Sequence, residues 1–315
     1  AACLLHKNAH FTGPVTCISI DLDNKKYSWQ PFSEQIDNYK KDQNLYKNSL
    51  GNRIVFEEIN HTLGLTFLYS WQASTKYGFV KKTKLLNHSG KKLYVKVIDG
   101  LRNILPAGVS LRTQQEMSNL ANAYKVSECN SDDNYALYYM NALLMDKPDP
   151  GESLFSNIVW SHSSDNIELS VNEKSISTFL SNDEFEEDHL LKGKEGSFLN
   201  YIQKPLPFGH EMTWYIIADV QKSQSDISAI ISNLKDSESI EKKLEKSLAD
   251  NYSAFEKNIG MADGFQCTEV KTNDLHHTAN VTYNVLRGGV FFDYYNIQKN
   301  SFVLFLQKRS KKTFE

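Results

Sequence analysis

The sequence has no run of about 18 apolar residues, so no transmembrane helix is expected. Its formal net charge is only −3 over 315 residues, which gives no electrostatic support for nucleic-acid binding. The chain has four cysteines, and no two form a C-x-x-C pair, which argues against a structural zinc site: Cys3, Cys17, Cys129 and Cys267. A basic segment followed by an apolar one is also missing at the start, so no intact signal peptide is expected there.

Motifs that carry chemistry are equally scarce. The sequence contains no G-x-G-x-x-G or Walker pattern, no H-E-x-x-H and no G-x-S-x-G, so we assign no catalytic residue, no metal and no cofactor. A sugar isomerase would need a histidine acid and a carboxylate base at one site. His88, His162 and His210, with Glu116, Glu168 or Glu211, could supply such a pair, but any large domain offers these combinations.

What the chain does have is apolar and aromatic content. Apolar residues make up 40% and charged residues 23%, so the chain can bury a core. Aromatic residues make up 12%, which suits β-sheets and also surfaces that stack on sugar rings. Short alternating segments predict strands throughout the first two thirds. They are 15–23, 53–60, 63–72, 77–86, 91–99, 135–145, 157–162 and 211–220, and the first carries apolar groups on both faces. We therefore predict a large antiparallel sandwich over residues 1–221, with a turn at 24–32.

The segment Tyr77–Val109 is interpreted as a hairpin followed by a loop. Two strands flank the turn residues Asn87-His88-Ser89-Gly90, which predicts an antiparallel pair with one solvated face. The apolar stretch "DGLRNILPAGV" is then expected to leave the sheet edge as a loop. Within it, Arg102 and Asn103 are the polar groups expected to reach across an interface, and a partner for them should exist.

The pattern becomes helical after Gln221. Asp226 is a candidate cap for a first helix, and a second is predicted from Ser237 to Gly260 with an apolar stripe. We interpret residues 222–262 as a helical linker, and a partner-binding helix is the alternative. Residues 263–315 form a transition segment with a helix ending near Gly288.

Three stretches together resemble a known family. "FLYSWQASTKYGFVKKTKLLNHSGKKLYVKVIDGLRNILPAGV" is similar to the N-terminal sandwich of cellobiose-phosphorylase-like proteins. "WYIIADVQKSQSDISAIISNL" resembles the last sandwich strand and the following linker. "ADGFQCTEVKTNDLHHTANVTYNVLRGGVFFDYYNI" resembles the passage into the catalytic barrel. The resemblance covers most of 54–297 and implies a galactose-mutarotase-like β-supersandwich, a linker and then an (α/α)6 barrel, which this chain would reach only at its end.

The resemblance implies a parent enzyme of bacterial carbohydrate metabolism, a glycoside phosphorylase or hydrolase that transfers a glycosyl group. This chain would be its non-catalytic N-terminal domain, flanking an oligosaccharide, with inorganic phosphate and the barrel as partners of the parent enzyme. A homodimer is a further option, no membrane or nucleic-acid partner is expected, and a cytoplasmic location is favoured. The alternatives are a stand-alone sugar-binding or sugar-isomerising sandwich and a purely structural interaction module.

Seven residues are candidates for substrate or interface contact: Trp71, Tyr77, Arg102, Asn103, His276, His277 and Arg287. His276 and His277 are adjacent, so their side chains point apart and cannot share a metal in the usual way. Arg287 precedes Gly288-Gly289, which is interpreted as a helix stop, although exposed backbone amides there could also approach an anion.

Overall fold

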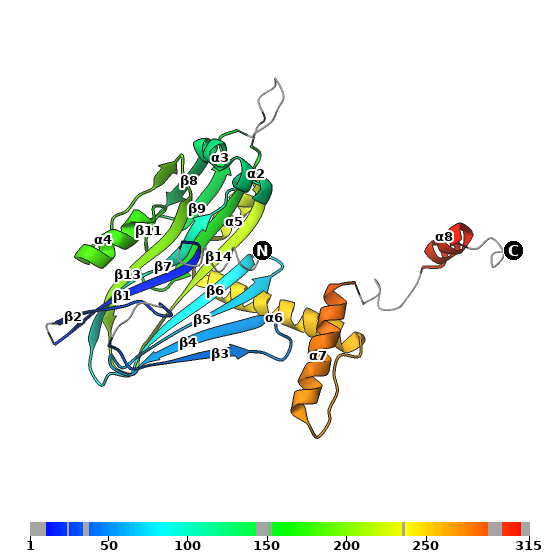
Figure 1. The fold of residues 1–315 in the computed structure, drawn as a ribbon, viewed down its shortest axis with the longest axis horizontal. Helices are drawn as coiled ribbons and strands as arrows, with labels where there is room; N and C mark the ends of the chain where they lie inside the picture. Colours follow the sequence, from blue (N-terminus) through cyan, green and yellow to red (C-terminus); the bar gives the residue numbers. More distant parts are fainter. Residues whose placement is uncertain are drawn as a thin grey trace. The chain divides into compact units, whose positions relative to one another are not determined.

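The computed structural model describes residues 11–23, 25–33, 38–142, 151, 153–234, 237–288 and 298–309. Two antiparallel sheets pack face to face, with short helices between some of their strands and further helices after the last strand (Figure 1). The predicted mainly β fold, an antiparallel sandwich with a C-terminal helical region, is confirmed. Contact clustering divides the chain into two units. The first contains Ala1–Tyr46 and Ile54–Ser247, and the second contains Lys47–Arg53 and Leu248–Glu315.

The smaller sheet has five strands in the order β11-β13-β7-β1-β2. Their bounds are β1 Gly13–Leu22, β2 Lys25–Trp29, β7 Leu93–Ile104, β11 Glu168–Ser170 and β13 Gly196–Leu206. The larger sheet has nine strands in the order β12-β8-β9-β10-β14-β6-β5-β4-β3. Their bounds are β3 Lys41–Lys47, β4 Arg53–Asn60, β5 Leu65–Ser74, β6 Gly78–Asn87, β8 Lys125–Asn130, β9 Tyr135–Met140, β10 Phe155–Ser163, β12 Leu190–Lys192 and β14 Glu211–Ser223.

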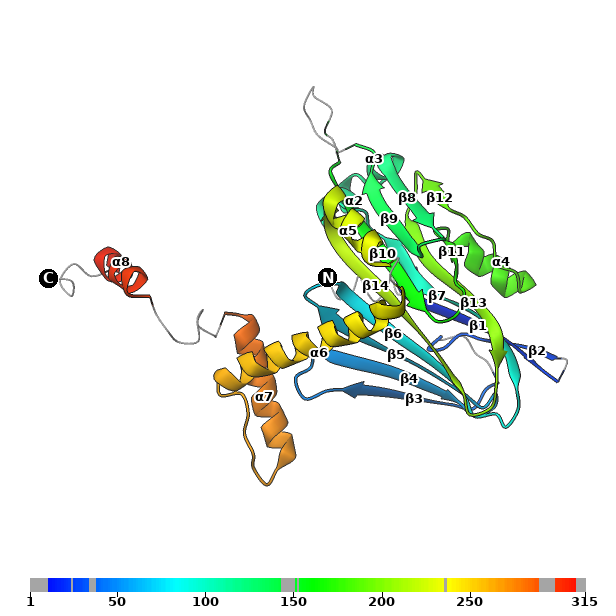
Figure 2. The same cartoon turned by 180° about the vertical axis from the view of Figure 1, so that it is seen from behind.

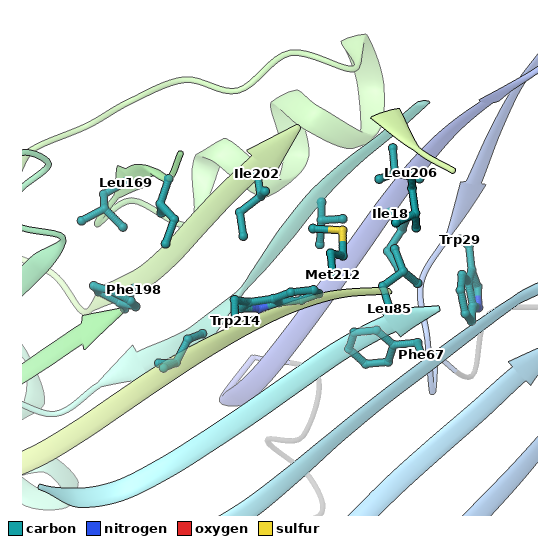
Figure 3. Packing of buried hydrophobic residues seen from close by; sticks show 14 of the residues in the cluster. Ile18, Trp29, Phe67, Leu85, Leu169, Phe198, Ile202, Leu206, Met212 and Trp214 are labelled. Carbon is teal, nitrogen blue, oxygen red and sulfur yellow. The ribbon is translucent and has the colours of Figure 1, made fainter. Parts of the chain in front are cut away.

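The main core lies between the two sheets. Ile18 and Ile202 from the smaller sheet and Phe67, Leu85 and Trp214 from the larger one are all buried there (Figure 3). The opposite face of the smaller sheet is also covered, because Cys17 and Ile98 pack with Phe179 of helix α4, Lys174–Asn182. Strand β1 is therefore buried on both faces, as its sequence predicted.

The predicted hairpin around Asn87 is wrong. Strand β6 pairs with β5 and β14 in the larger sheet, whereas β7 pairs with β1 and β13 in the smaller one. The turn between them carries the chain from one layer to the other. The buried Asn87 side chain fixes this crossing, because its Nδ2 donates to the carbonyls of Lys91 and Leu206, each 2.8 Å away.

The predicted loop after Asp99 is also wrong. Residues up to Ile104 continue β7, which lies inside the smaller sheet with neighbours on both sides. Leu101 is paired with Pro14 of β1 and with Phe198 of β13. The segment is apolar because a strand covered on both faces needs apolar side chains on both faces, not because a loop covers a core.

Other local differences occur where the alternation of apolar and polar residues is weak. Lys25–Trp29 forms β2 rather than a turn. The sequence also did not predict strands β3, β8, β11, β12 and β13 or the helices α2 (Leu111–Glu116), α3 (Ser118–Tyr124) and α4. The strand predicted for 135–145 ends at Met140, and residues 143–145 lie outside the described residues.

The helices after the sandwich lie where the sequence predicted them, but α5 begins two residues before Asp226, the predicted cap. Helix α5, Gln224–Leu234, lies against β14 and β10 (Figure 2). Asp226 does take part in its N-terminal cap, in a reciprocal box: Ser223 N donates to Asp226 Oδ2 at 3.0 Å, and Asp226 N donates to Ser223 Oγ at 3.3 Å. Helix α6, Ser237–Met261, begins at the predicted residue and ends one residue past Gly260.

The second unit contains helix α7, Lys271–Leu286, and helix α8, Lys299–Arg309. Thr278 of α7 is buried, and its Oγ1 donates to the Gly264 carbonyl at 2.9 Å. Among the described residues, no helix is long and apolar enough to span a membrane.

Candidate functional site

A buried ion pair joins the two sheets. Lys81 of β6 and Asp99 of β7 are 0% and 1% exposed, and Lys81 Nζ lies 2.6 Å from Asp99 Oδ1. Thr16 Oγ1 donates to Asp99 Oδ1 at 2.7 Å, and Trp214 Nε1 donates to Asp99 Oδ2 at 2.7 Å. The carboxylate is therefore satisfied on both oxygens, as a buried charge requires.

The register explains why these groups meet. Asp99 follows Val95 and Val97 on the core-facing side of β7, and it is paired with Thr16 on one neighbour and Asn200 on the other. Side chains of paired residues lie on the same face of a sheet, so these three form a polar row. Asn200 is fully buried, and neither of its side-chain amide atoms has a hydrogen-bond partner among the described residues.

Opposite this polar row, the core-facing side of the larger sheet carries aromatic residues that range from buried to exposed. Lys81 Nζ lies 5.0 Å from the ring centroid of Tyr69, whose pKa is raised to about 12 by burial and by the charge of Asp99. Trp71 is paired with Lys81 and is partly exposed on this same core-facing side of β5. Phe79 is paired with Ala73, faces the same way and is 56% exposed.

Tyr69, Trp71 and Phe79 are named here the inner-face aromatic surface. They lie on two adjacent strands, on the face that elsewhere packs against the smaller sheet. Trp71 and Phe79 are diagonal neighbours across the β5–β6 pair, a separation that large rings can bridge. The arrangement offers flat apolar rings beside hydrogen-bonding groups, a combination that suits binding and supplies no acid, base or nucleophile.

The other predicted residues of the sandwich lie elsewhere. Tyr77 is in the turn before β6, is 6% exposed and packs edge-on against Trp160 at 6.0 Å between ring centroids. Arg102 of β7 lies 3.8 Å from Glu173 Oε1, so its ion-pair partner is in the same sandwich. Asn103 has a φ of 53°, and its Nδ2 donates to Thr12 Oγ1 at 3.1 Å. The structure does not bring these three residues to Trp71.

The predicted residues of the second unit lie on or next to α7. His276 is exposed, while His277 Nε2 lies 2.8 Å from the Asp263 carbonyl oxygen. Arg287 is the C-cap residue, and its guanidinium lies 5.4 Å from the ring centroid of Tyr283. Gly288 follows with a φ of 88°, and Gly289 lies outside the described residues.

Sequence reasoning missed Lys81, Asp99, Trp214 and Asn200. The sequence did contain a signal, namely a charged residue at a core-facing position in each of two strands. Asp99 is on the same face of its strand as the core residues Val95 and Val97. Lys81 is likewise on the same face of its strand as the core residue Leu85. Such a pair implies that the two strands face each other, because an unpaired charge in a core is strongly destabilising.

A cysteine–histidine–glutamate arrangement lies on β8 and the segment before β12. Cys129 Sγ is 3.4 Å from His189 Nδ1, and His189 Nε2 is 3.2 Å from Glu187 Oε2. Burial raises the pKa of the Cys129 thiol to about 12, and the charges of Glu187, Asp188 and Glu128 add to the effect. The group is therefore a neutral thiol at neutral pH, which opposes a nucleophilic role. The described residues contain no cluster of three or more His, Cys, Asp or Glu placed to hold a metal.

No protein-family model matches the sequence, and no curated protein does. Solved structures do show similarity. A bacterial glucoamylase complexed with acarbose has a TM-score of 0.48 and 9% identity, over 85% of this chain and 34% of that one. A chain described as a kojibiose phosphorylase from the human microbiome has a TM-score of 0.41 and 10% identity, over 76% of this chain and 27% of that one. A family GH92 α-mannosidase from Bacteroides thetaiotaomicron has a TM-score of 0.37 and 10% identity, over 76% and 27%.

These three proteins are carbohydrate-processing enzymes by name, and the chain spans about a third or less of their lengths. Similarity at this level does not assign the chain to a family.

Proposed function

We propose that this chain is the sandwich portion of a carbohydrate-active enzyme, that it is non-catalytic, and that it contacts an oligosaccharide through the inner-face aromatic surface. The observation that carries the proposal is a pair of rings, the partly exposed Trp71 and the exposed Phe79, on the core-facing side of adjacent strands. Sugar rings have apolar faces that stack on aromatic side chains, and hydroxyl groups that need neighbouring polar atoms. The sequence resemblance over residues 54–297 supports the same assignment.

The buried ion pair holds in place the strands that carry these rings. Lys81 and Asp99 are too buried to reach a substrate, and Asp99 is held by Thr16 and Trp214. A fixed ion pair under Tyr69 keeps β5 and β6 in register with the smaller sheet. The rings of Trp71 and Phe79 are therefore presented on a rigid surface, which reduces the entropy lost on binding.

The proposed function also includes a partner for the helical region. We propose that the second unit, with Leu275, Tyr283 and Leu286 exposed on α7, packs against the catalytic barrel of the parent enzyme. His276, His277 and Arg287 are then candidates for contacts in that interface. Inorganic phosphate would be a substrate of the parent enzyme if it is a phosphorylase.

The test is titration of the whole chain with cello- and malto-oligosaccharides by calorimetry. Trp71→Ala and Phe79→Ala should each weaken binding about tenfold, the loss expected for one stacking contact of about 1.4 kcal/mol. Phe208→Ala is the matched control, because Phe208 is 58% exposed and lies in the turn between β13 and β14. Equal loss in Phe208→Ala, or no binding of any oligosaccharide by the unaltered chain, would contradict the proposal.

A further inference from the structure

Among the described strands, four lie at the edges of the two sheets, and β3 differs from the other three. Strands β2, β11 and β12 have five, three and three residues. Strand β3, Lys41–Lys47, has seven residues and is the outermost strand of the larger sheet beside β4 (Figure 2). In the part of the chain that the structure describes, no strand pairs with its outer side. A long open edge of this kind is a template for pairing with another strand.

The backbone groups of alternate β3 residues point toward this open edge. On the β4 side, the Lys40 carbonyl accepts from the His61 N–H at 2.9 Å, and the Asn48 N–H donates to the Arg53 carbonyl at 3.2 Å. Both bonds belong to one antiparallel register. The N–H and C=O groups of successive residues in such a strand point to opposite sides. Even-numbered residues therefore bond toward β4, and at the centre of the strand Gln43 and Leu45 point their N–H and C=O groups outward.

Strand β3 also exposes a large apolar or aromatic side chain on each face. Gln43 Nε2 donates to Oε2 of the fully buried Glu58 at 2.7 Å, so Gln43 lies on the core-facing side. Leu45 is two residues further along the strand, lies on the same side and is 65% exposed. Tyr46 lies on the other face, where its hydroxyl group donates to Glu57 Oε2 at 2.9 Å, and it is 51% exposed. A strand paired at this edge would cover part of both side chains.

Two of the central registers for pairing with a second copy are unfavourable. A twofold axis makes the two β3 strands antiparallel, so each register has one residue that lies opposite itself. The register centred on Asn44 places Lys41 opposite Lys47 at both ends, and like charges directly opposite each other are destabilising. The register centred on Gln43 places Lys41 opposite the exposed Leu45, which pairs a charged side chain with an apolar one.

The register centred on Leu45 has neither fault. Leu45 lies opposite Leu45 of the second copy on the core-facing side, and Asn44 lies opposite Tyr46 on the other face. Gln43 lies opposite Lys47, so no two like charges face each other. The outward N–H and C=O groups of Leu45 meet those of its counterpart, as in a hydrogen-bonded antiparallel pair. The edge is therefore complementary to itself in hydrogen bonding, charge and apolar contact.

We propose that β3 pairs with β3 of a second copy of this chain, antiparallel and centred on Leu45, so that the two nine-stranded sheets join into one continuous sheet. The proposal goes beyond the function proposed above and does not depend on it, because neither Trp71 nor Phe79 takes part. One pair of edge strands buries less surface than a standard protein interface. The dimer should therefore be weak, with a dissociation constant of about 10–100 μM.

The experiment is sedimentation of the whole chain in the analytical ultracentrifuge at concentrations from about 1 to 500 μM, which span the expected constant. We expect a monomer at the low end and a dimer at the high end. Leu45→Lys places two ammonium groups opposite each other and should raise the dissociation constant about tenfold or more. Leu190→Lys is the matched control, because Leu190 is 50% exposed on β12, at the other edge of the same sheet. It should dimerise as the unaltered chain does.

Disulfide formation tests the register. The Cα atoms of a hydrogen-bonded antiparallel pair are about 5.5 Å apart, within the range that a disulfide spans. Leu45→Cys should therefore form an intermolecular disulfide under mild oxidation. Gln43→Cys is the control, because in this register the two copies of residue 43 are four positions apart along the strands, about 13 Å. Both variants are made in a Cys3→Ser/Cys267→Ser background, since Cys267 is exposed and Cys3 lies outside the described residues.

Three results would overturn the proposal. The first is a chain that stays monomeric over the whole concentration range. The second is a Leu45→Lys variant that dimerises as tightly as the unaltered chain, which would place the contact elsewhere. The third is a disulfide that forms through Gln43→Cys and not through Leu45→Cys, which would rule out the register centred on Leu45.

Discussion

Lys81 Nζ lies 2.6 Å from Asp99 Oδ1, and the two residues belong to opposite sheets of the sandwich. They are 18 positions apart in the chain and are separated by the crossing at Asn87. Trp214 and Thr16 complete the shell of the carboxylate. A fully buried ion pair thus fixes how the two layers of the sandwich face each other.

Removing one member of this pair should be strongly destabilising. Asp99→Leu leaves the Lys81 ammonium buried without its counter-charge. Lys81→Met likewise leaves the Asp99 carboxylate buried without a positive partner. Each change should lower the free energy of unfolding by about 3–5 kcal/mol, because an uncompensated charge remains in the core. Urea unfolding followed by circular dichroism measures this directly.

The double variant Lys81→Met/Asp99→Leu distinguishes a charge effect from simple loss of packing. With both charges gone, the loss should be smaller than the sum of the two single losses, since no charge is left buried. Additive losses would contradict the ion-pair account. Lys84→Met is the control, because Lys84 forms its 2.6 Å ion pair with Glu211 at the exposed face of the same strand.

Asp183 connects α4 to two strands and makes part of the stability dependent on pH. Its Oδ2 lies 2.7 Å from Lys26 Nζ and 2.6 Å from Lys96 Nζ. Burial alone would raise the pKa of Asp183, but the hydrogen bonds from Lys26 and Lys96 outweigh it and hold the pKa below its ordinary value of 3.8. A lowered carboxyl pKa stabilises the folded state above the unfolded pKa, and the stabilisation is lost as pH falls through the folded pKa.

Asp183→Asn tests this sign. Asparagine also tolerates the left-handed conformation at this position, where φ is 60°. The variant should be less stable by about 1 kcal/mol between pH 5 and 7, a modest value because Lys26 is largely exposed. The difference should shrink below about pH 4 as Asp183 becomes protonated. A difference that stays constant down to pH 2 in acid unfolding curves would argue against this assignment.

Several strand positions could be predicted from the sequence, but the pairing of strands could not. Arg53–Asn60 is β4 as predicted, because alternation marks a half-buried strand wherever it pairs. The same alternation in β6 and β7 fits a hairpin within one sheet and a crossing between two sheets equally well. The crossing is decided by Asn87, whose bonds to Lys91 and Leu206 depend on β13, far away in the sequence.

Only part of the candidate site could be predicted from the sequence, for a related reason. Trp71 could be named from its type, since an aromatic residue in a strand is a candidate for sugar contact. Lys81 lies in the run "KKTK", where charged residues suggest a solvated face, and only the position of Asp99 in the opposite sheet shows that Lys81 is buried. The packing of α5 on β14 and β10 is likewise specified by no local pattern.

The cysteines should differ sharply in reactivity. Cys267 is exposed, whereas Cys17 is fully buried and burial raises the pKa of its thiol to about 12. Cys129 is partly buried with its own thiol pKa also raised to about 12. Iodoacetamide at neutral pH should therefore modify Cys267 first, with Cys129 slower and Cys17 unmodified until the chain unfolds.

Mass spectrometry of peptides over a time course measures the order. A Cys3→Ser background removes the cysteine that lies outside the described residues. Modification of Cys17 as fast as Cys267 in the folded chain would contradict the buried placement of β1. In urea all three thiols should react at similar rates, which controls for differences in the peptides themselves.

Gly78 and Gly90 provide a matched pair for testing the turn that positions Tyr77. Both have positive φ angles, 80° and 78°, so alanine is strained at either position by about 1 kcal/mol. A Cβ at Gly90 would meet no atom within 4 Å, whereas one at Gly78 would lie 2.5 Å from the Ala218 carbonyl oxygen. Because that oxygen belongs to the backbone of β14, it cannot move aside without distorting the β6–β14 pairing.

Gly78→Ala should therefore lower the free energy of unfolding by about 2–4 kcal/mol, and Gly90→Ala by only about 1 kcal/mol. The difference between the two variants isolates the steric contact from the backbone strain that they share. It is read from urea unfolding of both chains at one temperature. Equal losses of stability in the two variants would show that β14 does not approach Gly78 as closely as the structure places it.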